Sequence, residues 1–311
     1  SSGGFLEAIP LTSFVTMSLA AVGRADHPVV RKGVDFLAAT VRPDGSWPID
    51  SNLSIWLTTL SVNALAEGPN GLASMPTDEV ERIRDWLLAQ QLHHAHPYTQ
   101  AAPGGWGWSH LSGSVPDADD TSGCLIALAN LPHSVESVRA AEEGIRWLLA
   151  LQNRDGGWPT FCNGWGHLPF DRSGADLSAH ALRACAAWYA HCEGIDRGVQ
   201  EQRAASYRGH ITGIGLAMLD RSIKAGLDFV RKTQRADGPW VPLWFGNQSV
   251  PDDENPTYGT ARVLAAYRDL NEQGSPEAVR GLAWLGGVQN LDGGWGGSRG
   301  GSTRELGASP R

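Results

Sequence analysis

Two stretches of this chain repeat one pattern: Gln152-Asn-Arg-Asp-Gly-Gly-Trp158 and Gln289-Asn-Leu-Asp-Gly-Gly-Trp295. Related versions end at Trp47 and Trp240, and a fifth version, from Gln91 to Trp106, carries an insertion. The steps between successive tryptophans are 59, 52, 82 and 55 residues, which is the period of a two-helix repeat with loops of variable length. The repeats therefore predict a chain built from pairs of helices.

Each repeat contains one amphipathic and one apolar segment. In residues 77–90 the side chains of Val80, Ile83, Trp86 and Leu87 share one helical face, which predicts an amphipathic outer helix. Residues 135–152, 222–234 and 276–289 repeat that pattern. The second segments are apolar nearly all round, which predicts helices buried on both sides; they cover residues 5–21, 52–66, 119–130, 175–189 and 257–267.

This alternation predicts an all-α fold, an α/α barrel with apolar helices inside and amphipathic helices outside. Each tryptophan is expected to pack in the turn, and each glutamine amide to cap free backbone groups. We expect residues 1–22 to be a leading helix joined to an upstream part, residues 23–296 to form the barrel, and residues 297–311 to be an irregular tail. An inner helix should follow Trp295, so we expect a barrel incomplete at both ends and a segment of a longer protein.

Composition narrows the function classes. The chain has 311 residues, of which 41% are apolar and 19% charged, a balance typical of a packed globular protein. Its net charge of −8 argues against a nucleic-acid groove, because no Lys/Arg stripe is available to neutralise phosphates. No apolar run reaches transmembrane length and no signal peptide is recognisable. The cysteines have no paired spacing and predict reduced thiols in a cytoplasmic protein: Cys124, Cys162, Cys185 and Cys192.

Carboxylates crowd the start of the third apolar segment, in Pro116-Asp-Ala-Asp-Asp-Thr121. One interpretation is an N-cap followed by an acidic first turn, which a helix dipole favours. However, Asp117, Asp119 and Asp120 place three carboxylates within four residues, which is more than capping requires. Because like charges raise the pKa of at least one neighbour, a proton could be held there.

A second polar pair lies at the same place in the next repeat. Asp176 and His180 are i, i+4 neighbours, which fits either an ion pair or a functional pair. Both motifs begin inner helices, so a barrel would bring them to one mouth. A histidinium beside the carboxylates would stabilise the anion left after proton donation, and we therefore expect an unusually strong general acid.

These motifs resemble those of a known family. The Gln-x-x-Asp-Gly-Gly-Trp repeats are similar to the QW motifs of squalene–hopene and oxidosqualene cyclases, and Asp117-Ala-Asp-Asp-Thr121 resembles the DxDDTA motif of squalene–hopene and class II terpene cyclases. The resemblance covers nearly the whole chain, but about the C-terminal half of a full-length member. It implies triterpene cyclisation of a polyene such as squalene to a hopene-like polycycle. Because the second barrel lies outside these 311 residues, we do not expect the isolated segment to be active.

The resemblance also implies residue roles. Asp119 matches the acid that protonates the terminal alkene, with Asp117 and Asp120 beside it. His180 matches the histidine that polarises this acid, and Asp176 the carboxylate that orients the imidazole. Tyr258, in Tyr258-Gly-Thr260, matches a tyrosine of the proton-resupply network; the aromatic residues implied to line the cavity and stabilise carbocations are Trp56, Trp108, Phe161 and Trp244.

The tryptophans that end the repeats are expected to pack instead: Trp47, Trp158, Trp240 and Trp295. The mechanism implied by the resemblance requires no metal and no cofactor. The expected partners are the apolar polyene, a second copy of the chain, and the inner face of the cell membrane, to which the protein would attach peripherally.

Three alternatives stay open. A class II cyclase of a prenyl diphosphate would use the same aspartates but need a basic diphosphate pocket. A protein prenyltransferase β-subunit would need a zinc site of Asp, Cys and His, for which Cys162 and His167 are the close pair. A non-catalytic helical binding scaffold would keep the tryptophan repeats but has no use for the aspartates and histidine.

Overall fold

The computed structural model describes residues 2–97, 99–161, 171–196, 216–247 and 250–295. Within these ranges the regular structure is helical apart from two short strands, β1 (Trp158–Pro159) and β2 (Ser173–Gly174), which pair antiparallel. Two short 3-10 turns, η1 (Gly71–Ser74) and η4 (Pro251–Asp253), complete the elements. The prediction of an all-α fold of the α/α type is confirmed.

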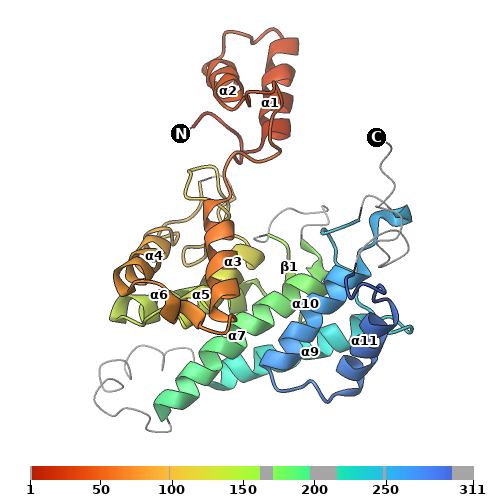
Figure 1. Ribbon diagram of the computed structural model, residues 1–311. Coiled ribbons are helices and arrows are strands. Elements are labelled where there is room, and N and C mark those ends of the chain that lie inside the picture. The colour runs from red at the N-terminus through yellow and green to blue at the C-terminus, as the bar shows by residue number, and fades with distance from the viewer. Residues whose placement is uncertain (1, 98, 162–170, 197–215, 248–249, 296–311) are drawn as a thin grey trace.

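The apolar segments form the inner helices: α3 (Ser54–Ala66), α5 (Ala118–Asn130), α7 (Ala175–Asp196) and α10 (Pro256–Asp269). They lie side by side in that order, and each packs against the next (Figure 1). On α5 the side chains of Cys124, Leu125, Ala127 and Leu128 are all fully buried, because small and apolar residues occur on every side of this helix.

The amphipathic segments form the outer helices: α4 (Thr77–Ala89), α6 (Val135–Leu151), α9 (Leu216–Thr233) and α11 (Pro276–Gly287). Helix α6 packs against α5, α9 against α7, and α11 against α10. On α6 the buried face carries Val138, Ile145 and Leu148, and the helix begins with a capping box formed by Ser134 and Ser137.

The N-terminal helices are arranged differently from the rest. Helices α1 (Ile9–Ala21) and α2 (Pro28–Ala39) pack on each other and project away from the other helices (Figure 1). Phe14 of α1 is 63% exposed and Leu57 of α3 is 54% exposed. Burial on both sides was therefore a wrong prediction for α1 and α3, because α1 does not pack along α3 as the later inner helices pack along one another.

The expected division of the chain stays a prediction. Helix α1 lies in the stretch 1–22, and its packing partner α2 begins beyond that boundary. The expected tail, 297–311, lies outside the described residues.

Hydrogen bonds of the tryptophan indoles tie each turn to the helix before it. The indole N–H donates to the carbonyl ten residues earlier in four repeats: Trp47 to Leu37, Trp158 to Leu148, Trp240 to Val230 and Trp295 to Leu285. Gln152 donates to the carbonyls of Gly156 and of Ser222 in the first half of α9, at 2.7 and 3.0 Å. The glutamine amide therefore binds a backbone carbonyl of its own turn, as expected, and also a carbonyl inside the next outer helix, which is not a free helix end.

No helix in the described part of the chain is both long and apolar enough to cross a membrane. Cys124 and Cys185 are buried free thiols, as expected. Cys162 and the Cys192 side chain lie outside what the structure describes.

Candidate active site

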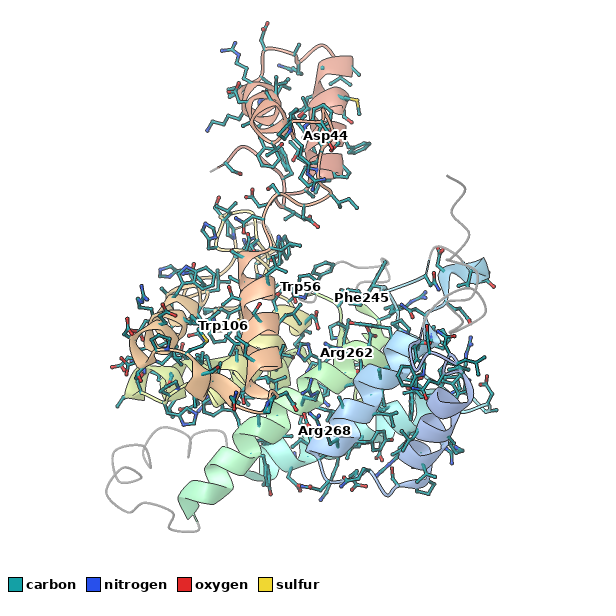
Figure 2. All side chains as sticks on the ribbon, viewed as in Figure 1. Asp44, Trp56, Trp106, Phe245, Arg262 and Arg268 are labelled. Carbon is teal, nitrogen blue, oxygen red and sulfur yellow. The ribbon has the colours of Figure 1, made fainter. Side chains whose placement is uncertain are left out.

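Three inner helices converge on one carboxylate of the fourth, Asp119 in the first turn of α5. His180 of α7 places its Nδ1 atom 2.5 Å from Asp119 Oδ1. Arg262 of α10 donates from its Nη2 atom to the same oxygen at 3.2 Å. The Trp56 indole of α3 also hydrogen-bonds to Asp119. In Figure 2, Trp56 and Arg262 lie toward the upper end of the helix array, where these inner helices begin.

Asp117 caps the same helix. Its carboxylate accepts the backbone N–H of Asp120 at 2.7 Å, so the capping interpretation is right for this residue. Asp117 and Asp120 are each only 4% exposed. Capping does not account for Asp120, whose Oδ1 atom is buried without a hydrogen-bond partner.

The three carboxylates have different proton affinities. Burial raises the pKa of Asp117 to about 7, and the nearby charge of Asp119 adds to the effect. Burial and the charge of Asp117 raise the pKa of Asp120 well above its usual value. Burial also acts to raise the pKa of Asp119, but His180 and Arg262 outweigh it and lower this pKa to about 2. At neutral pH the buried Asp117–Asp120 pair can therefore hold a proton beside an ionised Asp119.

The expected histidinium is not what this arrangement favours. Burial, followed by the charge of Arg262, lowers the pKa of His180 to about 4. This shift favours the neutral imidazole, which would donate its Nδ1–H to Asp119. The cation of the site is Arg262, which our sequence analysis missed. A charged residue one turn after Tyr258, on a helix predicted to be buried, was the available signal.

Asp176 differs from its expected role as the group that orients the imidazole. It is 1% exposed, and neither of its carboxylate oxygens has a hydrogen-bond partner. The reason is that His180 turns its Nδ1 atom toward α5 and Asp119 rather than back along α7. Burial raises the pKa of Asp176 to about 6.

Tyr258 lies next to Arg262. The guanidinium carbon of Arg262 is 5.8 Å from the centre of the Tyr258 ring, within the range of a cation–π contact. Burial raises the pKa of the Tyr258 hydroxyl, so the phenol is neutral. Phe245, which was not among the predicted site residues, packs on Tyr258, with the centres of the two rings 5.1 Å apart.

The predicted aromatic residues occupy two places. Trp108 and Phe161 meet edge to face, with ring centres 6.4 Å apart, and the backbone of Phe161 bridges to that of Asp117. Trp56 adjoins Asp119 directly, as described above. Trp244 is 38% exposed.

Among the described residues, no group of three or more His, Cys, Asp or Glu side chains is arranged to hold a metal ion. Cys162 and His167, the pair relevant to a zinc site, lie outside the described residues.

Comparison with known proteins decides the family. The family model of the squalene–hopene cyclase C-terminal domain matches residues 52–306, which include all the inner helices from α3 onward. The chain belongs to the squalene–hopene cyclase family. Its resemblance to that family, inferred above from the repeats and the aspartate motif, is therefore confirmed.

Relatives in this family are longer than the chain. A probable squalene–hopene cyclase of Sinorhizobium fredii is 26% identical over 310 residues, with 92% of this chain and 42% of that protein covered. A terpene cyclase–glycosyl transferase fusion protein of Humicola fuscoatra is 29% identical over 300 residues, covering 87% of this chain and 21% of that protein. The chain thus spans about two fifths of the bacterial relative and one fifth of the fungal one.

A solved structure supports the fold. The ent-copalyl diphosphate synthase from Streptomyces platensis superposes with a TM-score of 0.53 and 20% identity, over 88% of this chain and 41% of that one. This likeness concerns the arrangement of helices alone.

Proposed function

We propose that this squalene–hopene cyclase family chain is the acid-bearing part of a triterpene cyclase. In this proposal Asp119 protonates the terminal alkene of an apolar polyene such as squalene, and the cations that follow close to a hopene-like polycycle. The observation that carries the proposal is the convergence of Trp56, His180 and Arg262 on Asp119, beside a carboxyl pair that holds a proton.

The chemistry requires such a site. An alkene is a very weak base, so its protonation needs a strong acid in a preorganised, water-poor environment. The O–H bond of protonated Asp119 breaks, a C–H bond forms at the terminal alkene carbon, and a tertiary carbocation and a carboxylate remain. The N–H groups of His180 and Arg262 stabilise that carboxylate.

Asp119 must first acquire its proton. An apolar polyene at this mouth would remove water from Asp119 and so raise its pKa. The Asp117–Asp120 pair, with its raised pKa values, is the proton store that we assign to this step. The aromatic faces of Trp56, Trp108 and Phe161 can stabilise the later cations without attacking them, because π-systems attract cations and are poor nucleophiles.

The lipid solubility of such a substrate extends the proposal to location. We place the whole protein in the cytoplasm, attached peripherally to the inner face of the cell membrane, which co-sedimentation with lipid vesicles would check.

The test uses the longer protein that contains this chain. It is incubated with squalene or with geranylgeranyl diphosphate, with and without a chelator, and the products are identified by mass spectrometry. Squalene cyclisation that survives the chelator is expected. Turnover of geranylgeranyl diphosphate alone would favour the prenyl diphosphate alternative.

Replacing the proton donor gives the sharper test. Asp119→Asn keeps the side-chain size and removes the acid, so product should fall below detection while thermal unfolding stays cooperative. Asp78→Asn is the matched control, because Asp78 also lies in the first turn of a helix, α4, but faces solvent; it should keep full activity. An active Asp119→Asn enzyme would exclude the proposed mechanism.

A further inference from the structure

Arg262 has an unusual position for an arginine on an inner helix. It lies in the second turn of α10, and its side chain is only 21% exposed. Its Nη2 atom bonds to Asp119 Oδ1 at 3.2 Å, while its Nε atom is buried without a hydrogen-bond partner. The Tyr258 ring lies beside the guanidinium, with its centre 5.8 Å from the guanidinium carbon. The structure therefore orients this guanidinium toward one carboxylate instead of toward solvent.

We propose that Arg262 is a positioning residue that supplies the permanent positive charge beside Asp119, so that His180 acts as a neutral hydrogen-bond donor instead of a histidinium. The proposal rests on the acid role of Asp119 proposed above. The proposal gives a residue of α10 a role in the site. Neither the aspartate motif nor the spacing of Asp176 and His180 predicts that role.

His180 and Arg262 could each supply the positive charge beside Asp119, because both contact the same carboxylate oxygen. His180 Nδ1 and Arg262 Nη2 both contact Oδ1 of Asp119. Two full positive charges at one oxygen repel each other, and a guanidinium does not lose its proton in proteins, whereas an imidazole does so readily. The imidazole is therefore the partner that stays neutral. Because Oδ1 is occupied by both donors, the transferable proton belongs on Oδ2.

The proton transfer balances with this assignment. The O–H bond at Oδ2 breaks, the alkene π electrons form the new C–H bond, and the carboxylate regains its negative charge beside Arg262. The proton returns to Asp119 from the Asp117–Asp120 pair or from water, after the terminating step releases one.

Other titratable groups surround Asp119 and its two donors. They are Asp117, the N-cap of α5, Asp120 of α5, Asp176 and Arg183 of α7, and the neutral Tyr258 of α10. Arg183 is held by Asp269 at 2.6 Å and lies near Glu67, so carboxylates already balance its charge. Arg183 is therefore the suitable control for a second arginine near His180.

A titration of the 311-residue chain itself tests the proposal without any activity. The chain is labelled with ¹⁵N-histidine, the His180 ring signals are assigned with His180→Gln, and ring ¹⁵N shifts are recorded from about pH 3.5 to 8, so that the wild-type midpoint is covered. We expect His180 to be neutral, with its proton on Nδ1, at neutral pH. Arg262→Gln should raise its titration midpoint by at least about one pH unit. Arg262→Lys, which keeps the charge, and Arg183→Gln should leave it closer to the wild-type value.

Two results would overturn the proposal: a wild-type His180 that is charged at pH 7, or a midpoint that Arg262→Gln leaves unchanged. The Lys variant shows whether a shift reflects charge, because a purely structural loss would appear in both substitutions.

Kinetics in the longer protein give the second readout. Arg262→Gln should lower kcat by about 10²-fold or more with little change in KM, and Arg262→Lys should recover part of the loss. The pH profile of the wild-type rate should also lack a step near the ordinary pKa of histidine, because His180 does not change its charge there. If no form of the protein converts a polyene, the proposed function fails, whereas the titration still decides the role of Arg262.

Discussion

Asp176 is a buried carboxyl group for which the loss of hydration outweighs the favourable effects of nearby backbone N–H groups and of Arg262. Its pKa of about 6 in the folded chain exceeds the reference value of 3.8, so protonation favours the folded state. Ionising this buried group lowers the free energy of unfolding. The loss is absent below pH 3.8, grows as the pH rises from 3.8 to about 6, and is complete above about pH 6. Asp176→Asn should therefore stabilise the chain by up to about 3 kcal/mol at pH 8 and by almost nothing at pH 4, as measured by urea unfolding.

The opposite result would carry information about His180. If Asp176→Asn lowered the unfolding free energy at pH 8, Asp176 would have a favourable charged partner, and the orienting contact expected from the i, i+4 spacing would be restored.

At the same scale, the sequence predicted part of the site. The motif positions place Asp119 and His180 at the starts of neighbouring inner helices, and helix packing then brings them together. Spacing along one helix could not decide which partner the imidazole chooses, because Asp176 and Asp119 both lie within reach of one side chain. Arg262 was missed because periodicity assigns a lone charge to a solvated face.

At the scale of the helices, the tryptophan of each repeat turn explains several glycines on the outer helices, because its ring packs where a side chain would otherwise lie. A side chain added at Gly144 would meet the Trp106 ring at 2.8 Å, and one at Gly226 would meet the Trp158 ring at the same distance. A side chain added at Gly281 would meet the Trp240 ring at 2.6 Å. Three outer helices, α6, α9 and α11, therefore carry a glycine against which the tryptophan of the preceding repeat packs; α4 has none.

Gly226→Ala should consequently destabilise the chain. The added Cβ atom would lie 2.8 Å from Trp158 and 2.9 Å from Leu182, and both side chains are fully buried. Overpacking of this kind costs about 1 to 3 kcal/mol, which exceeds the gain in helix propensity. Gly286→Ala is the matched control, because no atom lies within 4 Å of its added Cβ. Thermal unfolding should show a clear loss for the first variant and no loss for the second; equal effects would contradict this packing role.

The fifth repeat shows how far sequence predicts an element. In the repeat from Gln91 to Trp106, the Trp106 indole donates to the Leu87 carbonyl, 19 residues earlier. The Gln91 amide donates to the Gly104 carbonyl, 13 residues later. In the uninterrupted repeats the same separations are 10 and 4. Nine extra residues therefore leave the turn itself intact, and the motif was recognisable despite them.

Across the whole molecule, the repeats predicted the order of helices but not the position of α1 and α2.

Two kinds of interaction connect the inner helices, namely ion pairs and packing. The ion pairs lie at the end opposite to Asp119, where Arg268 bonds to Glu67 at 2.8 Å (Figure 2). Such exposed pairs contribute little to stability. Packing among α3, α5, α7 and α10 therefore holds the array together, and α1, which lacks that packing, is not fixed beside it by any pattern in its sequence.

Helix α3 consequently presents an apolar stripe with helical spacing: Leu57, Leu60 and Leu65 are 54%, 38% and 44% exposed. Apolar side chains gathered on one face favour association, whereas a single exposed one does not. We therefore expect the isolated chain to associate with a second copy through this stripe, and Leu57→Glu combined with Leu60→Glu to yield monomers with unchanged folding, because neither side chain is in the core. Leu291→Glu is the control: Leu291 is 95% exposed and lies apart from the stripe, so this variant should associate as the wild type does. Analytical ultracentrifugation of the three proteins measures this, and a wild-type chain that is monomeric at all concentrations would refute it.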